Sequence, residues 1–166
     1  GGVALQALQI AKALGAHTWV TSGSDDKLAR AKALGADEVI NHAQVDVGKE
    51  VRNRTSKRGV DVVIDSVGEK TWGQSLFALG KRGRLVTCGG TSGPMLQMDV
   101  RRLFWNQWTI MGSTMGNEEE FAAAAGEFAR GQLHAIVDSV HDITHGADAY
   151  ARLMSGEQFG KVVVSL

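Results

Sequence analysis

Two kinds of hydrophobic pattern alternate along the chain. Apolar residues at helical spacing mark one set of segments, and short β-rich or continuously apolar runs mark the other. Strands that alternate with helices of about ten residues are typical of right-handed βαβ units, so we predict an α/β fold with a parallel sheet. The pattern predicts helices over residues 3–14, 24–34, 46–57, 69–79, 118–130 and 145–154, a short helix before residue 108, and strands over residues 17–22, 38–41, 60–65, 84–88, 108–113, 137–141 and 161–166.

Glycines lie between many of these predicted elements. The chain has 21 glycines in 166 residues, which is well above the usual share of about 7%, and a single proline. Gly15, Gly35, Gly59 and Gly131 each follow a predicted helix and are expected to end it. The strand predicted over residues 60–65 is nearly continuous in apolar residues, which is typical of a strand covered on both faces.

The first predicted element is a helix, whereas a doubly wound sheet has a central strand just before that helix. The chain opens with Gly1-Gly2-Val3-Ala4, which matches the second half of the phosphate-binding pattern Gly-x-Gly-x-x-Gly/Ala. A plain tight turn into a helix is the alternative. We predict a doubly wound parallel sheet of the Rossmann type that lacks its first strand. Residues 1–166 would then form one incomplete dinucleotide-binding domain.

Composition removes several classes of function. The 18 basic and 18 acidic residues cancel, so no overall charge favours nucleic acid or an anionic membrane surface. No apolar run is long enough to span a membrane, and no signal-peptide pattern opens the chain. The single cysteine, Cys88, cannot form an internal disulfide, which fits a reducing compartment, so we expect the cytoplasm. The five histidines have no metal-binding spacing, and no zinc site is expected in this chain.

The tip of the second strand of such a sheet selects the cofactor. An acidic residue there binds a free ribose 2′-hydroxyl, whereas small or basic residues admit a 2′-phosphate. The predicted tip holds Ser22, and Lys27 and Arg30 lie on the following helix. This pattern favours NADP(H) over NAD(H), with NAD(H) as the second choice. An ordinary solvated helix lysine is the alternative interpretation of Lys27.

Four segments carry a family resemblance: residues 1–12, 27–41, 59–68 and 156–164. Together they resemble the medium-chain dehydrogenase/reductase superfamily, and above all its branch of zinc-type alcohol dehydrogenases and quinone oxidoreductase-like proteins. The resemblance covers essentially the whole chain. It implies the C-terminal cofactor-binding domain of an oxidoreductase, with an N-terminal catalytic domain that holds the substrate pocket and any zinc lying outside these residues.

The resemblance also implies which residues meet the cofactor. Its pyrophosphate would lie near the first glycines and a basic residue of the last strand, its adenosine near the second and third strand tips, and its nicotinamide near the later tips. The implied residues are Gly1, Gly2, Val3 and Lys161 for the pyrophosphate, Ser22, Lys27 and Asn41 for the adenosine, Val67, Gly68, Cys88, Gly89 and Gly90 for the nicotinamide and its ribose, and Ser113, Thr114 and Met115 for the carboxamide.

No catalytic residue is expected within the chain. Cys88 has no histidine near it in sequence, so a small buried residue is favoured over a nucleophile. Short-chain dehydrogenases need Tyr-x-x-x-Lys, but Met154 stands four residues after Tyr150, the only tyrosine. A methyltransferase is disfavoured because Ser22 stands where an acidic residue normally binds its ribose. Asp65 is expected to close a strand, Tyr150 to pack, and Trp105 and Trp108 to lie in the core or an interface.

The predicted function follows from the cofactor. The parent protein would transfer a hydride between NAD(P)H and a carbonyl, alcohol or activated alkene, and this chain alone would be inactive. A non-catalytic dinucleotide-sensing or dimerisation module is the alternative. The expected partners are a small-molecule substrate and a second copy of the chain, because the resemblance implies a homodimer through the edge strand at residues 109–113.

Overall fold

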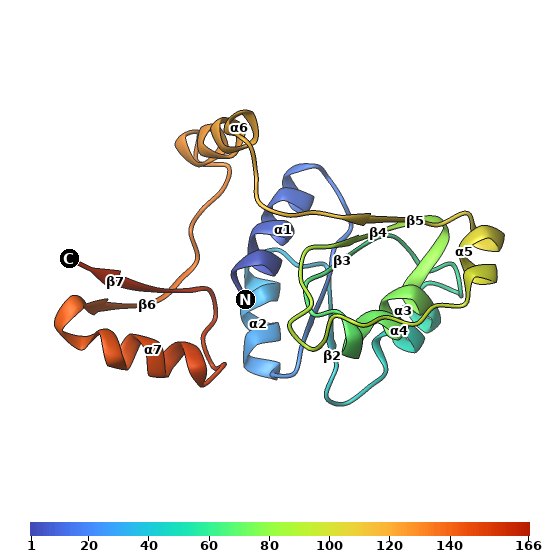
Figure 1. The fold of residues 1–166 in the computed structure, drawn as a ribbon, viewed down its shortest axis with the longest axis horizontal. Helices are drawn as coiled ribbons and strands as arrows, with labels where there is room; N and C mark the ends of the chain where they lie inside the picture. Colours follow the sequence, from blue (N-terminus) through green and yellow to red (C-terminus); the bar gives the residue numbers. More distant parts are fainter. The chain divides into compact units, whose positions relative to one another are not determined.

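The computed structural model describes all residues from Gly1 to Leu166 (Figure 1). Helices and strands alternate as the hydrophobic pattern predicts. The helices are α1 (Gly2–Ala13), α2 (Asp25–Ala33), α3 (Val47–Arg54), α4 (Glu69–Ala78), α5 (Val100–Asn106), α6 (Glu118–Ala129), the 3₁₀ turn η1 (Ile143–His145) and α7 (Gly146–Met154). The strands are β1 (Trp19–Ser22), β2 (Glu38–Asn41), β3 (Val60–Asp65), β4 (Leu79–Thr87), β5 (Thr109–Gly112), β6 (Val137–Asp142) and β7 (Lys161–Ser165).

The strands form three sheets. β1 pairs with β2, β3 and β5 flank β4, and β6 pairs with β7. The β3–β4–β5 and β6–β7 pairings are parallel, as predicted. β1 and β3 belong to different sheets, which agrees with the expected gap where the first strand of a Rossmann-type sheet would lie.

Three of the four predicted glycine stops are confirmed, at Gly15, Gly35 and Gly131. The fourth is wrong, because α3 ends at Arg54 with Thr55 as its C-cap, well before Gly59. Gly15, Gly35, Gly59 and Gly131 all adopt positive φ angles. The N–H groups of Gly15 and Gly35 donate to helix carbonyls three residues earlier, which satisfies groups that the helix end leaves unpaired. The glycine-rich composition therefore reflects helix ends in this chain.

β4 begins five residues earlier than its predicted start at residue 84. Leu79 pairs with Val60 of β3, and the register shifts between Val60 and Val62. Arg82 adopts a φ of 59°, which marks the irregular stretch that hides the early part of the strand from a hydrophobic pattern. Pairing with β3, rather than intrinsic β-propensity, therefore sets where β4 starts.

The chain divides into two compact parts. The first comprises residues 1–20, 26–39 and 117–166, and its core holds Leu8, Ala31 and Ala36, with Val20, Leu34 and Val39 against them. The second comprises residues 21–25 and 40–116. Within it α3 and α4 lie side by side, and its core holds Trp72, Leu76, Leu79, Leu85 and Trp108.

Several predicted burials are wrong. Val63 of β3 contacts the core of the second part, but its neighbours Val62 and Ile64 point to the opposite face and are 42% and 51% exposed. β3 is therefore covered on one face, not on both. Tyr150 is exposed instead of packed, whereas Trp108 is buried as expected. Trp105 is exposed, so of its two expected places the core is wrong and an interface stays a prediction.

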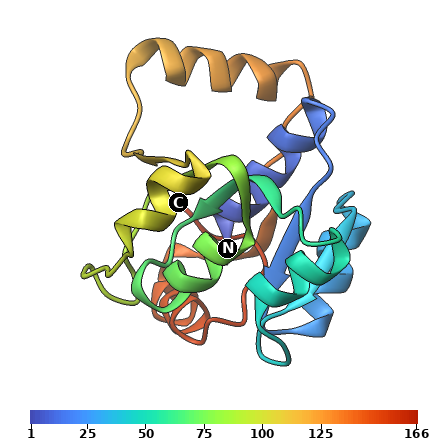
Figure 2. The ribbon, with the colours of Figure 1, turned by 90° about the vertical axis from the view of Figure 1, so that its right-hand side faces the viewer.

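α6 is a regular helix (orange in Figure 2) that buries none of its residues. A capping box starts it: the Asn117 side chain accepts from the Glu120 N–H, and the Glu120 carboxylate accepts from the Asn117 N–H. Its alanines and this cap favour the helix locally, so Phe121 can remain exposed on it. No helix in the structure combines the length and apolar character needed to cross a membrane.

Candidate cofactor-binding site

The N-terminus of α1 gathers positive charge. A Cβ placed on Gly2 would lie 2.6 Å from Cε and 3.0 Å from Nζ of Lys161, so the Lys161 side chain occupies the space that glycine leaves. The charged ends of Lys27 and Lys161 both lie close to Gly1. Free N–H groups at a helix N-terminus attract anions. Gly1, Gly2 and Lys161, which are expected at the pyrophosphate, lie together here with Val3 exposed beside them, and Lys27, which is expected at the adenosine, lies near the same helix end.

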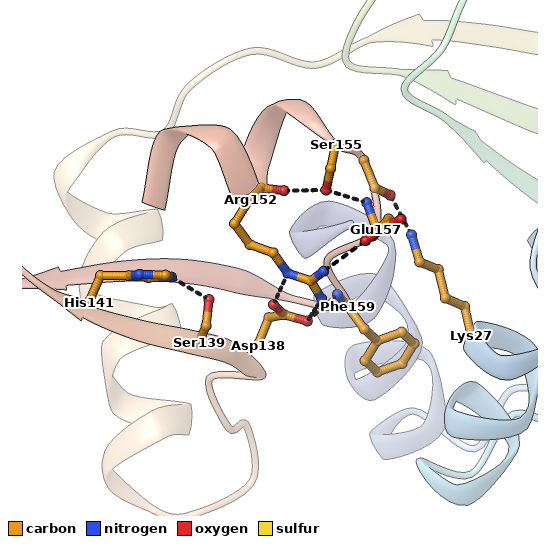
Figure 3. A network of polar contacts seen from close by, with 9 residues as sticks. Lys27, Asp138, Ser139, His141, Arg152, Ser155, Glu157 and Phe159 are labelled. Atoms are coloured by element: carbon orange, nitrogen blue, oxygen red, sulfur yellow. Dashed lines mark hydrogen bonds and ion pairs between the residues drawn. The ribbon is translucent and has the colours of Figure 1, made fainter. Parts of the chain in front are cut away.

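A polar network joins Lys27 to the turn before β7 (Figure 3). The Lys27 ammonium donates to the carbonyl of Gly156, at 2.5 Å, in the turn between α7 and β7. Arg30, one turn further along α2, holds its guanidinium 4.1 Å from the centre of the Phe159 ring. These two contacts connect α2 to the turn before β7, and Lys161 is the first residue of that strand.

Asp138 of β6 holds the same turn from the other side (Figure 3). Its carboxylate accepts from Arg152 Nε at 2.9 Å and from the Phe159 N–H at 2.7 Å. Arg152 also reaches Glu157, at 3.2 Å. The Asp138 side chain is only 5% exposed. The Arg152 guanidinium, followed by the Phe159 N–H, lowers the pKa of Asp138 to about 2.

The tips of β1 and β2 meet at the expected adenosine end. Ser22 ends β1 and Asn41 ends β2, and the Ser22 carbonyl accepts from the His42 N–H at 3.0 Å. Asn41 donates its side-chain amide to Asp25 at 2.7 Å. Asp25, the acidic residue nearest to Ser22 in sequence, therefore already binds the side chain of Asn41.

His42 is a candidate that sequence reasoning missed. Its ring atom Cε1 lies 3.1 Å from the position of a Cβ on Gly23, directly after Ser22. The signal available in the sequence was its place next to Asn41, just after a predicted strand. A ring at this tip adds a planar, nitrogen-bearing group to the expected adenosine end.

Asp65 organises the loop after β3. Its side chain is buried, and its carboxylate accepts from the N–H groups of Val67 at 2.8 Å and Gly68 at 3.0 Å. The hydroxyls of Thr71 and Ser75 on α4 also donate to it, at 2.8 and 2.7 Å. Burial alone would raise the pKa of Asp65, but these hydrogen bonds outweigh burial and lower it. The expectation that Asp65 closes a strand is confirmed, and its carboxylate also shapes the turn.

The loops after β3 and β4 approach each other through glycines. Gly68 has a φ of 90°, and a Cβ there would lie 2.9 Å from Gly90 Cα. A Cβ on Gly89 would lie 2.7 Å from the Ser66 carbonyl oxygen. The Val67 carbonyl accepts from both the N–H and the hydroxyl of Ser92. Side chains at these glycines would force the two loops apart.

The predicted nicotinamide residues therefore gather at the carboxyl ends of parallel strands. Cys88 follows β4, is exposed rather than buried, and donates its N–H to the Asp65 carbonyl at 3.1 Å. Ser113 follows β5 and donates its N–H to Thr87 at 2.9 Å. Thr114 and Met115 continue this tip, and Met115 is 97% exposed with a φ of 53°. No group of three His, Cys, Asp or Glu residues is placed to hold a metal ion.

Comparison with known proteins identifies the family. The family model of the zinc-binding dehydrogenases matches residues 2–130. The chain belongs to this family. Within it, the chain corresponds to an NAD(P)-binding domain of Rossmann type of the zinc-type alcohol dehydrogenases and quinone oxidoreductases.

Individual relatives agree with this assignment. The chain is 33% identical over its whole length to a zinc-type alcohol dehydrogenase-like protein of Schizosaccharomyces pombe, covering 49% of that protein. It is 31% identical to a quinone oxidoreductase of Pseudomonas aeruginosa, covering 99% of this chain and 53% of that one. The chain therefore spans about half the length of such relatives.

Solved structures share the zinc-binding dehydrogenase domain's fold. The alcohol dehydrogenase of the archaeon Aeropyrum pernix superposes with a TM-score of 0.87 at 31% identity, over 96% of this chain and 46% of that one. The quinone oxidoreductase of Escherichia coli in complex with NADPH superposes with a TM-score of 0.85 at 30% identity, over the whole of this chain and 54% of that one.

Proposed function

We propose that this chain binds a nicotinamide dinucleotide and orients its nicotinamide for hydride transfer to or from a carbonyl, alcohol or activated alkene. The observation that carries the proposal is the position of Lys161 over Gly2 at the N-terminus of α1. Gly2 has no side chain, so the Lys161 ammonium can approach the helix N-terminus. This cation and the unpaired N–H groups of the first helical turn would both bind a pyrophosphate. The hydride chemistry belongs to the cofactor, and the chain supplies binding and orientation.

Each local group has a part in this proposal. Gly1, Gly2, Val3 and Lys161 would hold the pyrophosphate, and the strand tips at Asn41 and His42 would face the adenosine. Val67 and Gly68 would border the nicotinamide ribose. Cys88, Gly89 and Gly90 would border the nicotinamide, and Ser113, Thr114 and Met115 its carboxamide. Any zinc and the catalytic side chains would belong to a catalytic domain outside residues 1–166.

The cofactor we propose is NADP(H). Ser22 offers no carboxylate to a ribose hydroxyl, and Lys27 lies on α2, where its ammonium could move from the Gly156 carbonyl to a 2′-phosphate. The E. coli quinone oxidoreductase, which is similar to this chain, was solved with NADPH. Among other relatives, an NAD-dependent alcohol dehydrogenase of Sulfurisphaera tokodaii is 30% identical, so NAD(H) is the competing cofactor.

We also propose a homodimer through β5. This strand is the edge of the β3–β4–β5 sheet and pairs only with β4. Met111 on it is 40% exposed, and Trp105 shortly before it is 63% exposed. Unpaired backbone and apolar side chains at a sheet edge favour pairing with another copy. A two-fold dimer should sediment as a single species at micromolar concentration, and a monodisperse monomer would contradict this pairing.

Calorimetric titration of the full-length protein with NADPH and NADH tests the binding proposal. We expect binding of both, with NADPH tighter by about tenfold, which corresponds to about 1.4 kcal/mol. Equal affinities or tighter NADH would overturn the assignment of NADP(H), and no binding of either would overturn the whole proposal. Binding without turnover of any carbonyl, alcohol or alkene would instead support a dinucleotide-sensing or dimerisation module.

A further inference from the structure

A basic groove lies at the amino-terminal end of the β3–β4–β5 sheet. Three of its lining residues, Lys57, Phe77 and Trp108, come shortly before β3, β4 and β5 respectively. Because these strands are parallel, the groove is at the opposite end of the sheet from the loops at Gly68 and Cys88. Its volume is about 530 Å³, within the range of small-molecule sites, and α3 and α5 complete it with Lys49, Arg52, Asn53, Arg102 and Asn106.

Arg102 is the unusual side chain of this groove. It is half-buried, and its guanidinium lies 5.3 Å from the ring centre of Trp108 and 6.0 Å from that of Phe77. The two rings hold the cation in place, as cation–π contacts do. No protein acceptor takes a hydrogen bond from its guanidinium, which therefore presents its N–H donors to the groove and to solvent.

Arg52, its neighbour across the groove, has a different role. Its guanidinium donates to the carbonyls of Phe77 at 2.8 Å, Leu79 at 2.6 Å and Arg58 at 3.1 Å. It satisfies backbone carbonyls at the end of α4, at the start of β4 and in the turn after α3, so it builds the floor of the groove. The fold therefore pairs Arg52 with backbone carbonyls and leaves Arg102 without a protein acceptor.

The groove carries more positive charge than its surroundings neutralise. Neither Lys49, Lys57 nor Arg102 has a carboxylate at ion-pair distance. The acidic residues on or beside the lining helices have other partners. Asp99 pairs with Arg101 at 2.8 Å, Glu50 pairs with Arg54 at 2.7 Å, and Asp46 accepts the N–H of Lys49 as the N-cap of α3. The chain as a whole has no net charge, so the three cations are a local concentration.

Stabilisation of helix ends does not account for all four basic side chains of the groove. α3, α4 and α5 end near the groove, and cations there interact favourably with the last carbonyls of a helix. Arg52 makes such contacts directly. Arg102 makes none and instead lies near two aromatic rings, with its donors free to bind an anionic group in a bidentate manner.

We propose that this groove is a second ligand site, which binds a small molecule bearing a phosphate group. Arg102 would bind the phosphoryl oxygens in a bidentate manner, and Lys49 and Lys57 would neutralise its remaining charge. Asn53 and Asn106 offer amides to hydroxyls of the organic part, and the exposed face of Phe77 offers it an apolar contact. The site is separate from the dinucleotide loops, and only its test, which uses NADPH, rests on the proposed dinucleotide binding.

Titration in the presence of saturating NADPH tests this site, because the dinucleotide then blocks the phosphate-binding end of α1. The probes are inorganic pyrophosphate and ATP, added to the full-length protein. We expect one additional molecule of either probe to bind. Equal affinities would assign recognition to the phosphoryl group alone, and tighter ATP would show that Phe77 and the amides contact the organic part. Absence of binding by both would overturn the proposal.

Two neighbouring arginines supply the matched variants. Arg102→Gln should weaken probe binding at least tenfold, whereas Arg101→Gln on the same helix should change it less than twofold, because Arg101 pairs with Asp99 away from the groove lining. The affinity for NADPH should be unchanged in both variants, which shows that the fold is intact. Equal weakening by the two variants would mean nonspecific attraction to positive charge and would overturn the assignment to Arg102.

Discussion

Lys161 packs against Gly2 at the N-terminus of α1, although the two residues lie at opposite ends of the sequence. The lysine side chain fills the space where any other residue at position 2 would place its Cβ, 2.6 Å from Lys161 Cε. A Cβ that close to another carbon forces one of the two to shift. The glycine thus holds the ammonium near the helix N-terminus, where an anion would bind.

Gly2→Ala should therefore weaken dinucleotide binding by displacing Lys161. We expect the Kd for NADPH to rise about tenfold, or about 1.4 kcal/mol, with little loss of fold because alanine favours a helix. Calorimetric titration measures the Kd. Gly73→Ala is the matched control, since Gly73 lies in α4 with nothing within 4 Å of an added Cβ. An unchanged Kd for Gly2→Ala would show that the position of Lys161 does not matter for binding.

Ser22→Asp should exchange the cofactor preference. A carboxylate at the tip of β1 would repel a 2′-phosphate and accept a hydrogen bond from a ribose 2′-hydroxyl. We expect the ratio of the NADPH and NADH dissociation constants to shift at least tenfold towards NADH. Thr21→Asp, one position earlier and on the opposite face of β1, should leave the ratio within twofold. A parallel loss of both cofactors in Ser22→Asp would contradict the placement of Ser22 at the ribose.

Gly68→Ala should destabilise the second part of the chain through two effects. Alanine would be strained at a φ of 90°, and its Cβ would lie 2.9 Å from Gly90 Cα and from the Gly93 carbonyl oxygen. Together we expect a loss of about 2–4 kcal/mol in the free energy of unfolding, measured with urea. Gly15 has a φ of 73° and nothing within 4 Å of an added Cβ. Gly15→Ala should therefore lower the free energy of unfolding by only about 1 kcal/mol. Similar losses for both would rule out a steric contribution from the loop after β4.

Local patterns were enough to predict the alternation of helices and strands, most of the helix stops and the strand tips. Ser22 and Asn41 end their strands as expected because strand tips are set by short runs of sequence. Contacts between distant segments escaped prediction. The start of β4 depends on pairing with Val60, and the role of His42 depends on its approach to Gly23.

Burial was the least predictable property. Tyr150 is apolar enough to suggest packing, but whether a residue is covered depends on which elements reach it. Likewise, nothing in the local sequence reveals that four residues around Asp65 donate to its carboxylate, because two of them, Thr71 and Ser75, lie on the following helix. The close contact between Gly68 and Gly90 also cannot be predicted from local sequence, because it depends on how the two loops pack.

Asp138 should make stability depend on pH in acid. Its pKa falls from the ordinary value of 3.8 to about 2 in the folded chain, chiefly through Arg152. The ionised carboxylate therefore stabilises the fold fully above about pH 4, and this contribution is lost as the pH falls towards 2. Urea midpoints measured from pH 2 to 7 should differ most between the wild type and Asp138→Asn at neutral pH, and this difference should shrink in acid.

A second variant separates the ion pair from the rest of the network. Arg152→Gln removes the principal donor and should raise the pKa of Asp138 towards 3.8, so that the acid-dependent part of the stability shrinks while the Phe159 N–H still donates. Its urea midpoints should therefore depend less on pH between 2 and 4 than those of the wild type. If Asp138→Asn and the wild type lose stability in parallel over the whole range, Asp138 is not the group whose protonation loosens the turn before Lys161.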